Sequence, residues 1–306
     1  ILTHMGRFTP AMTAMLENAV PGVAFVPSGE GASSDVLVVM LDDREARNGV
    51  VEAMTPEVRW VHVFNAGMDR FPLHAAGRRV ITGSRGAAAP AIAEWVLAMM
   101  LAFAKQLPAS WVTGPPEHWG AAGLSVLRNN TLGLIGFGEI GREVARRALA
   151  FDMNVVAVRR TRAPSEIPGV EVVGSLGELL GAADHVVVTA PATPATRHLL
   201  NAKAFARMKP GAHLVNIARG TLIDQDALIA ALDDGTVAMA SLDVVDPEPL
   251  PAGHPLYAHP KVRVSPHISW SSPDTIMRTV EIFADNLRRY EAGEELRGVV
   301  DVTEGY

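Results

Sequence analysis

Three side chains that could together reduce a carbonyl group follow apolar segments in the second half of the chain: Arg219, Glu248 and His267. Arginine keeps its charge, and its planar fork of donors suits a carboxylate or a ketone oxygen. Histidine can exchange a proton near neutral pH, and a glutamate on its other ring nitrogen would orient the ring and favour its protonated form. Beside a nicotinamide ring, this set predicts hydride transfer to a carbonyl carbon, with Arg219 stabilising the charge on oxygen and His267 supplying the proton. Oxidation of the corresponding alcohol would reverse each step.

Each of these residues also has an ordinary structural interpretation. Arg219 could form only an ion pair, and His267 could be a packed histidine. His254, His259 and His267 lie close together in the sequence, but no carboxylate stands at ligand spacing and prolines separate them, so we expect no metal site. The position of the three side chains after predicted strands favours chemistry, because the carboxyl ends of parallel strands meet at one edge of a sheet, where cofactors bind.

A glycine-rich turn precedes these residues in the chain. An apolar run from Thr131 ends in Gly136, Gly138 and Gly141 at GxGxxG spacing, and an amphipathic segment over 142–151 follows at once. Between a strand and a helix, this spacing predicts a dinucleotide site, with the pyrophosphate at the helix N-terminus. The first glycine permits the turn, the second admits the pyrophosphate, and the third lets the helix pack on the strand. The alternative is a glycine-rich turn that binds no ligand.

The end of the next predicted strand, 154–158, should select the dinucleotide. NAD sites usually carry a carboxylate about 20 residues past the glycines for the ribose 2′-hydroxyl, whereas NADP sites place an arginine there for the 2′-phosphate. This chain has Arg159, Arg160, Thr161 and Arg162 at that point, and no acid. Guanidinium groups suit a phosphate dianion, so the sequence predicts NADP, with NADPH preferred over NADH. The alternative is a solvated run of charge.

Apolar segments alternate with helical patterns along the chain, which is typical of an α/β fold with parallel sheets covered on both faces. In the first part, the predicted strands are 1–5, 23–26, 36–41, 60–64 and 79–82, and the predicted helices are 11–19 and 44–54. A long helix over 90–107, ended by Pro108, is apolar on nearly every side, which predicts burial between domains or subunits. Further strands are predicted at 185–189, 213–217, 237–242 and 262–264, and further helices at 176–180, 202–208, 225–232 and 273–290.

Two loops carry other residues of interest. Residues 65–69 follow a predicted parallel strand at its carboxyl end, where ligands bind in such sheets, and Gly67 would let successive amides converge on an anion. An ordinary turn is the alternative. The loop over 110–127 contains Trp111 and Trp119, which we expect to pack against the protein rather than to bind.

The composition describes an ordinary globular protein of about two domains. The 306 residues are 48% hydrophobic and 20% charged, and the net charge of −6 argues against a nucleic-acid surface in general. The absence of cysteine excludes thiol catalysis, disulfides and cysteine-ligated zinc. No signal peptide is visible, and the longest apolar run, 91–104, contains Glu94 and is shorter than the ~20 residues that span a bilayer. We expect a cytoplasmic protein that contacts neither membrane nor nucleic acid.

Several motifs, in order along nearly the whole chain, resemble those of the D-isomer-specific 2-hydroxyacid dehydrogenases. They are LIGFGEIG (134–141), NIARGTLID (216–224), LDVVDPEPLP (242–251), HPLY (254–257) and SPHI (265–268). The resemblance implies two doubly wound parallel-sheet domains around a cleft: a Rossmann-like cofactor domain at 90–272, and a flavodoxin-like substrate domain at 1–89 with 273–306. It also implies a homodimer, and a small substrate such as glyoxylate, hydroxypyruvate or a pyruvate-like 2-oxo acid, or the corresponding D-2-hydroxy acid.

The same resemblance implies roles for individual residues. Arg219 would bind the substrate carboxylate and oxo group, His267 would be the acid/base, and Glu248 would be its partner. The loop whose amides hold the substrate carboxylate is matched by Asn65, Ala66, Gly67 and Met68. Cofactor contacts are implied for Glu139, Ile140, Thr196, Ile217, Ala218 and Asp243, the last at the nicotinamide amide, although Asp243 could also only cap or position. Arg159 stands where NAD-using members have an aspartate.

The sequence departs from the family pattern at two informative places. Asn129 replaces a usual glycine, which asparagine can do because it accepts positive φ. Trp270 follows the predicted catalytic histidine where small residues are common, so we expect its ring near the substrate. Glu248 argues against formate dehydrogenase activity, since those members carry glutamine there.

Two other functions are open on the same scaffold. One is a nucleotide-sensing interaction protein that resembles the C-terminal-binding corepressors, which also carry a tryptophan after the histidine. The other is phosphoglycerate-type dehydrogenase activity, for which Met68 offers none of the expected basic residues. A corepressor should turn over poorly, whereas we expect ready NADPH oxidation with a 2-oxo acid.

Overall fold

The computed structural model divides the chain into two compact units. It describes residues 2–6, 8–29, 34–41, 46–120, 123–161, 163–303 and 305. The first unit comprises Ile1–Ala88 and Ser271–Tyr306, and the second comprises Ala89–Trp270. The predicted limits, 1–89 with 273–306 and 90–272, lie one or two residues from these boundaries.

The first unit is built on a parallel sheet. Its elements are β1 (Leu2–Gly6), α1 (Pro10–Ala19), β2 (Phe25–Pro27), β3 (Val36–Met40), α2 (Ala46–Ala53), β4 (Trp60–Val63), the 3-10 helix η1 (Leu73–Ala75), β5 (Val80–Gly83) and α9 (Pro273–Ala292). The five strands are parallel in the order β2-β1-β3-β4-β5. Past the edge strand β5, Thr82 forms an antiparallel bridge with Val299.

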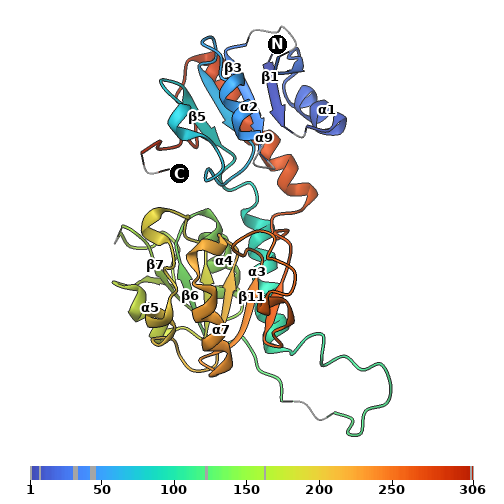
Figure 1. Ribbon diagram of the computed structural model, residues 1–306, viewed down its shortest axis with the longest axis vertical. Coiled ribbons are helices and arrows are strands. Elements are labelled where there is room, and N and C mark those ends of the chain that lie inside the picture. Colours follow the sequence, from blue (N-terminus) through green and yellow to red (C-terminus); the bar gives the residue numbers. More distant parts are fainter. Residues whose placement is uncertain are drawn as a thin grey trace. The chain divides into compact units, whose positions relative to one another are not determined.

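Both faces of this sheet are buried, as the side chains of β3 show. Successive residues of a strand point to opposite faces. Leu37 and Val39 belong to the apolar cluster that contains the buried residues of α2. Val36 and Val38 belong to the cluster formed with α1 and α9. The helices therefore cover the strands from both sides, as Figure 1 shows, and the predicted doubly wound arrangement is confirmed.

The second unit is a larger sheet of the same kind. Its elements are α3 (Ala89–Ala104), β6 (Thr131–Ile135), α4 (Glu139–Ala150), β7 (Asn154–Val158), β8 (Val170–Val172), α5 (Leu176–Ala182), β9 (His185–Val188), η2 (Pro194–Thr196), α6 (Ala202–Phe205), β10 (Ala212–Asn216), η3 (Gly220–Leu222), α7 (Gln225–Asp233), β11 (Val237–Leu242), α8 (Pro255–Ala258) and β12 (Val262–Val264). Seven parallel strands run in the order β12-β11-β10-β9-β6-β7-β8. The strand order reverses between β6 and β9, so the turn after β6 lies at a topological switch point, where open α/β sheets bind ligands.

Most predicted elements are present, with ends that differ by a few residues. Positions 1, 44 and 45 of the predicted elements lie outside the described residues. The sequence does not predict β8 or α8, because β8 has only three residues with Glu171 in the middle and α8 has only four residues. Runs this short show no periodicity. Asn129 has φ 65°, as its replacement of a glycine predicts.

The long helix α3 packs against α4 and β10 of its own unit. Its side chains Val96, Leu97 and Met100 are buried, whereas Glu94 and Ala98 are exposed. The helix is therefore covered along one side within the second unit. The expected burial of its other apolar side chains between domains or subunits stays a prediction.

The two tryptophans of the segment after α3 do not pack. The rings of Trp111 and Trp119 are 71% and 84% exposed, so the expectation that they pack is wrong for the single chain. Prolines and glycines between them leave the segment without a helix or strand that would turn the rings toward a core, and Figure 1 shows it as an irregular loop.

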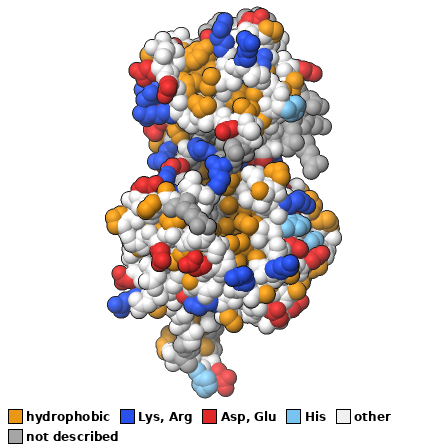
Figure 2. All heavy atoms as spheres, turned by 90° about the vertical axis from the view of Figure 1, so that its left-hand side faces the viewer, with side chains coloured by type: hydrophobic (Ala, Val, Ile, Leu, Met, Phe, Trp, Pro, Cys, Tyr) orange, Lys and Arg blue, Asp and Glu red, His pale blue; other side chains and the backbone are white. Residues whose placement is uncertain are grey.

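The surface mixes charges of both signs. On the face shown in Figure 2, basic and acidic side chains are interspersed among apolar ones. Within the part of the chain that the structure describes, every helix is too short or too polar to cross a membrane.

Candidate active site

The turn between β6 and α4 has the geometry of a phosphate-binding turn. Gly136 has φ 98°, and a side chain there would lie 2.7 Å from the backbone nitrogen of Ala190. A side chain at Gly141 would lie 2.9 Å from the carbonyl oxygen of Gly136. Gly138, in contrast, borders open space. The first and third glycines are therefore needed for packing, and the second leaves room for a ligand.

The N-terminus of α4 can hold an anion in that space. Gly138 is the N-cap residue and no side chain caps the helix, so the amides of Glu139 and Ile140 point out of the first turn, where the helix dipole favours negative charge. Thr189, which follows β9, donates its hydroxyl to the carbonyl oxygen of Gly136 at 2.8 Å and fixes the turn to the neighbouring strand. These residues fit a pyrophosphate group.

The loop after β9 is shaped by Thr196. Its Oγ1 accepts from the amide of Thr193 at 2.8 Å and donates to the carbonyl oxygen of Pro191 at 2.8 Å. The hydroxyl is thus engaged in holding the loop. Its predicted contact with the cofactor stays a prediction.

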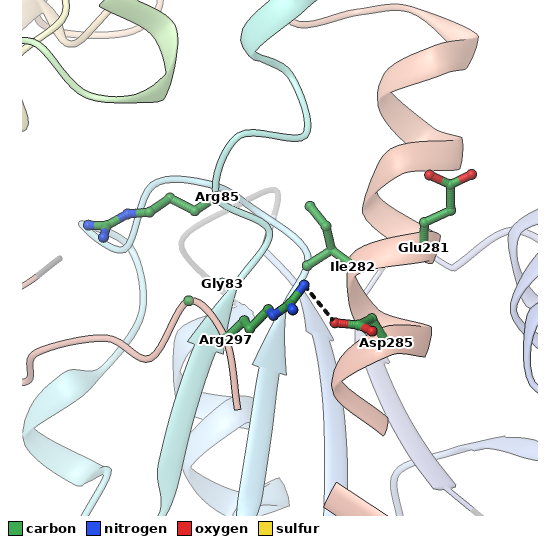
Figure 3. Close-up of a pocket in the computed structure, with 7 residues that line it drawn as sticks. Gly83, Arg85, Glu281, Ile282, Asp285 and Arg297 are labelled. Carbon is green, nitrogen blue, oxygen red and sulfur yellow. Dashed lines mark ion pairs between the residues drawn. The ribbon is translucent and has the colours of Figure 1, made fainter. Parts of the chain in front are cut away.

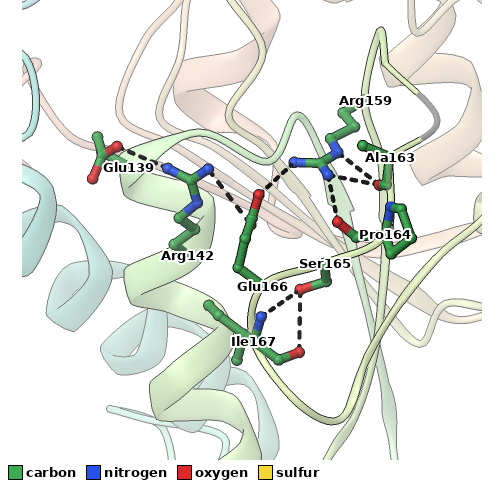
Figure 4. A network of polar contacts seen from close by, with 8 residues as sticks. All are labelled: Glu139, Arg142, Arg159, Ala163, Pro164, Ser165, Glu166 and Ile167. Carbon is green, nitrogen blue, oxygen red and sulfur yellow. Dashed lines mark hydrogen bonds and ion pairs between the residues drawn. The ribbon is translucent and has the colours of Figure 1, made fainter.

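Arg159, at the end of β7, is held by the loop that follows it (Figure 4). Its guanidinium donates to the carbonyl oxygens of Ala163 and Pro164, each at 2.6 Å, and its NH1 lies 3.6 Å from Oε1 of Glu166. The guanidinium carbon lies 5.8 Å from the ring centre of Phe137 in the glycine turn. The sequence prediction found the arginine but missed the acid that the loop brings back to it.

Two other arginines belong to the predicted basic run. Arg160 is exposed. Arg162 lies outside the described residues. The contact of this run with a 2′-phosphate stays a prediction.

The predicted contact between His267 and Glu248 is present, and the acid/base role of the pair stays a prediction. Nδ1 of His267 lies 3.0 Å from Oε2 of Glu248, and the two side chains are 34% and 23% exposed. Because a carboxylate only accepts, Nδ1 carries the hydrogen and Nε2 is the nitrogen left to take or give a proton. Burial raises the pKa of Glu248, but the hydrogen bond and charge of His267, with the charge of Arg219, outweigh it and leave the pKa below its usual value. The carboxylate therefore stays ionised and stabilises a protonated ring.

His267 has an unusual backbone conformation. Its φ is 56°, in the left-handed region that a residue with a side chain enters only when its surroundings hold it there. Its amide donates to the carbonyl oxygens of Asp243 and Ser265 at 2.9 and 3.0 Å. Its carbonyl oxygen accepts from the indole Nε1 of Trp270 at 2.8 Å. Trp270, predicted to contact substrate, thus also fixes the histidine, and its ring is 45% exposed.

The carboxylate of Asp243 accepts hydrogen bonds from the same loop. It is 1% exposed and accepts from the hydroxyl of Ser265 at 2.6 Å and from the amides of Ile268 and Ser269, each at 2.9 Å. This is the positioning role left open by the sequence. The cofactor contact predicted for Asp243 stays a prediction.

A tight turn after β10 positions Arg219. The buried Asn216 accepts from the amide of Ala218 at 3.1 Å and donates to the carbonyl oxygen of Arg219 at 3.0 Å, across Ile217. A side chain at Gly220 would overlap the carbonyl group of Val245, so the turn packs directly on the loop that leads to Glu248. This close approach, which the sequence prediction missed, explains how the charge of Arg219 acts on Glu248.

The other histidines near His267 have separate partners. Nδ1 of His254 accepts from the amide of Leu256 at 3.3 Å and caps α8. Nε2 of His259 lies 3.3 Å from Asp233. Across the described residues, no group of three or more His, Asp or Glu side chains is placed to hold a metal ion.

The loop after β4 in the first unit uses its side chains for structure. Asn65 accepts from the amide of Leu41 at 2.7 Å and donates to the carbonyl oxygen of Leu41 at 2.9 Å. Met68 is buried and contacts Gly83, while Ala66 is exposed and Gly67 half-buried. The side chains of Asn65 and Met68 are thus engaged in the fold, and the contact of the loop amides with the substrate carboxylate stays a prediction.

The first unit also has a pocket of about 330 Å³ beside α9, shown in Figure 3. Arg85, Glu281, Asp285 and Arg297 line it. Arg297 lies 3.5 Å from Asp285, which also holds Arg289 at 3.2 Å. Basic and acidic groups thus neutralise each other there, and the pocket shows no preference for one charge.

A glycine turn at the switch point of a parallel sheet, with a histidine, a glutamate and an arginine after neighbouring strands, defines the class of Rossmann-type dehydrogenases. Residues 97–269 match the family described as D-isomer specific 2-hydroxyacid dehydrogenase, NAD binding domain. The chain therefore belongs to the D-isomer-specific 2-hydroxyacid dehydrogenase family.

Individual relatives carry several enzyme names. A D-3-phosphoglycerate dehydrogenase of Methanocaldococcus jannaschii is 32% identical over 275 residues, which is 88% of this chain but only 52% of that protein. A glyoxylate/hydroxypyruvate reductase A of Serratia proteamaculans is 35% identical, over 70% of this chain and 68% of that protein. The structure of an NADPH-dependent glyoxylate/hydroxypyruvate reductase from Sinorhizobium meliloti, in complex with NADP and sulfate, superposes with a TM-score of 0.86 at 25% identity and covers 100% of this chain and 99% of that one.

Proposed function

We propose that this protein is an NADPH-dependent reductase of small 2-oxo acids, or the reverse dehydrogenase of D-2-hydroxy acids. The observation that carries the proposal is the 3.0 Å contact of His267 with Glu248, with Arg219 close enough to act on the same carboxylate. Glyoxylate, hydroxypyruvate and pyruvate-like acids are the first candidate substrates, because relatives named for the first two match the chain.

Each residue of the proposed active site has a separate role in the reduction. The nicotinamide cofactor, when bound, supplies the hydride. Arg219 binds the carboxylate and oxo group of the substrate, and its fixed charge stabilises the negative charge that builds on oxygen. Nε2 of His267 donates the proton to that oxygen, while Glu248 holds Nδ1 and stabilises the charged ring before transfer. The amides of the 65–68 loop are a further predicted contact of the substrate carboxylate.

Panel kinetics with NADPH and about a dozen 2-oxo acids test the proposal directly. We expect at least one small 2-oxo acid to be reduced readily. In Arg219→Gln, we expect kcat/KM to fall about 10²-fold or more, since a charge aimed at the developing oxyanion is removed. Arg263→Gln is the matched control, because that guanidinium donates to the nearby backbone carbonyl oxygens of Pro260 and Val262. Equal losses in the two variants, or no turnover of any 2-oxo acid, would contradict the proposal.

The corepressor-like interpretation is less well supported. The relatives described above are named as enzymes, and the acid/base pair is in hydrogen-bonding contact. Relatives named as D-3-phosphoglycerate dehydrogenases also match, but this chain covers only 52% and 40% of two of them. Including 3-phosphoglycerate and its oxo acid in the same panel distinguishes this reaction.

We propose further that two copies of the chain associate. Trp111, Val112 and Trp119, in the segment after α3, are 71%, 57% and 84% exposed, and apolar surface of this kind is typical of protein interfaces. Light scattering at micromolar concentration should give twice the mass of one chain, and Trp111→Ser with Trp119→Ser should weaken the dimer. The cytoplasmic location stays a prediction.

A further inference from the structure

A carboxylate lies between two arginines beside the predicted cofactor turn (Figure 4). Oε2 of Glu166 is 3.5 Å from NH2 of Arg142, and Oε1 is 3.6 Å from NH1 of Arg159. The arginines come from different parts of the fold: Arg142 is in the first turn of α4, where it also pairs with Glu139 at 2.9 Å, and Arg159 directly follows β7. Each oxygen of Glu166 therefore faces its own cation, which is how one anion bridges two guanidinium groups.

The position of this bridge is the one at which dinucleotide-binding units read the adenosine ribose. β7 is the strand after the glycine turn, and its carboxyl end is where a carboxylate selects the 2′-hydroxyl of NAD or an arginine admits the 2′-phosphate of NADP. The cation–π contact of Arg159 with Phe137 ties the cluster to the turn itself. This chain places both kinds of residue there, the arginine from the strand end and the acid from the loop seven residues later.

The two partners are held with different strength. Arg159 is 13% exposed and is fixed by two backbone carbonyl groups, so it stays in place without Glu166. The side chain of Glu166 is 59% exposed, and exposed ion pairs contribute little to stability because water and salt screen them. A hydrogen bond from its own amide and the charges of Arg142 and Arg159 lower the pKa of Glu166, which keeps it anionic at neutral pH. The acid is thus a charged but easily displaced occupant of a fixed cationic site.

We propose that Glu166 occupies the 2′-phosphate site of the cofactor and sets the balance between NADP(H) and NAD(H). This rests on the proposed use of a nicotinamide dinucleotide. When the cofactor carries a 2′-phosphate, the dianion replaces the carboxylate between Arg142 and Arg159, and Glu166 opposes it by its like charge. When the cofactor carries a 2′-hydroxyl, Glu166 stays and accepts its hydrogen bond, as the acid of an NAD site does. The chain therefore prefers NADPH but also binds NADH.

Binding of two adenosine fragments tests this without any turnover. Calorimetry on the full chain measures 2′,5′-ADP, which carries the 2′-phosphate, and 5′-AMP, which carries the hydroxyl. In Glu166→Gln we expect 2′,5′-ADP to bind about 5-fold tighter, which is about 1 kcal/mol, because one like charge is removed. We expect 5′-AMP to bind a few-fold weaker, because a neutral acceptor replaces a charged one. Arg159→Gln should do the opposite to 2′,5′-ADP.

Asp226→Asn is the matched control, since it removes the same charge from an exposed position on α7, which packs on β11, four strands along the sheet from β7. It should leave the ratio of the two affinities within about 1.5-fold, as expected for a distant screened charge. An unchanged ratio in Glu166→Gln, or weaker binding of both fragments, would overturn the inference while leaving the use of NADPH intact. Failure of the wild-type chain to bind 2′,5′-ADP would overturn both. Binding of both fragments without reduction of any 2-oxo acid would overturn only the proposed reaction.

Discussion

Two histidines of the second unit lie in opposite environments. His213, inside β10, is fully buried: its ring nitrogens contact His185 at 3.3 Å and Ser241 at 3.0 Å, and the ring of Phe103 stacks on it at 4.6 Å. Burial, and then the neighbouring His185, hold the pKa of His213 well below its usual range. His267, after β12, is 34% exposed and faces a carboxylate. The first histidine is kept neutral, and the second is placed to carry a charge.

The difference lies in the position along the strand. A residue inside a parallel strand is covered by helices on either face, so its charged form loses solvation. A residue after the strand lies at the open carboxyl edge, where a carboxylate from the next loop can reach it. His62 in β4 repeats the first case, with burial lowering its pKa to about 3 and with Thr82 and Ser84 as partners. Position relative to the strand end, rather than residue type, decides which histidine is partly exposed and meets a carboxylate.

The largest effect should come from removing the exposed histidine. In His267→Ala we expect kcat to fall by about 10²–10⁴-fold, because proton transfer by a positioned side chain is lost. NADPH binding, measured by fluorescence, should stay nearly unchanged, since the ring donates a proton and does not hold the cofactor. Cofactor binding weakened as much as kcat would contradict the assigned role.

Acid should weaken the fold through the buried histidines. Burial lowers the pKa of His185 to about 4 and that of His62 to about 3, whereas an unfolded histidine titrates near 6.5. Below about pH 6.5 the histidines of the unfolded chain bind protons, whereas the buried histidines of the folded chain stay neutral. Their contribution to the free energy of unfolding is therefore complete above that pH and decreases as the pH falls. Each such histidine contributes up to about 1.4 kcal/mol per pH unit.

Urea unfolding at pH 7.5, 6.5, 5.5 and 5.0 measures this dependence. Carboxyl groups with a lowered pKa, such as Glu248 and Asp184, lose their contribution only below their unfolded values near pH 4. The range between pH 5 and 6.5 therefore reports the histidines. A free energy of unfolding that is flat over this range would show that the buried rings are not held neutral.

Removing a buried histidine should lower the stability of the protein and leave kcat nearly unchanged, which is the reverse of removing His267. We expect His213→Ala to lower the free energy of unfolding by roughly 2–4 kcal/mol, through the cavity under Phe103 and the unpaired hydroxyl of Ser241. The kcat of the folded variant should stay within about twofold, as expected for a site away from the chemistry. Its loss of stability with acid should also be shallower by about 1.4 kcal/mol per pH unit. A large loss of kcat in a folded variant would contradict this prediction, because it would show that His213 also supports the reaction.

The smallest effect is expected from the indole that supports His267. Trp270→Phe keeps an aromatic ring but removes the donor to the carbonyl oxygen of His267. A hydrogen bond contributes about 1 kcal/mol net, so we expect kcat to fall about 5-fold with little change in the free energy of unfolding. Steady-state kinetics beside Trp119→Phe, whose ring is 84% exposed, gives the comparison. An equal effect on kcat in both variants would show that the hydrogen bond from Trp270 does not help to position His267.

The sequence by itself determined most of the helices and strands and where the candidate site residues lie along them. Glycine spacing, apolar runs and the residues that follow them are local signals, and they located the turn after β6 and the side chains of Arg219, Glu248 and His267. Parallel topology then places the ends of neighbouring strands together, so the contact of His267 with Glu248 was predictable before any coordinates were known.

Only the tertiary structure decided which side chains form ion pairs and hydrogen bonds with residues of other loops and strands. It placed Glu166 against Arg159, gave the carboxylate of Asp243 to the loop of His267, and paired His185 with His213. These contacts depend on loop return and strand neighbours, and periodicity records only which face a residue occupies. The residues that directly follow β7 in the sequence include arginines but no acid, because the acid that accompanies them reaches the site through the fold.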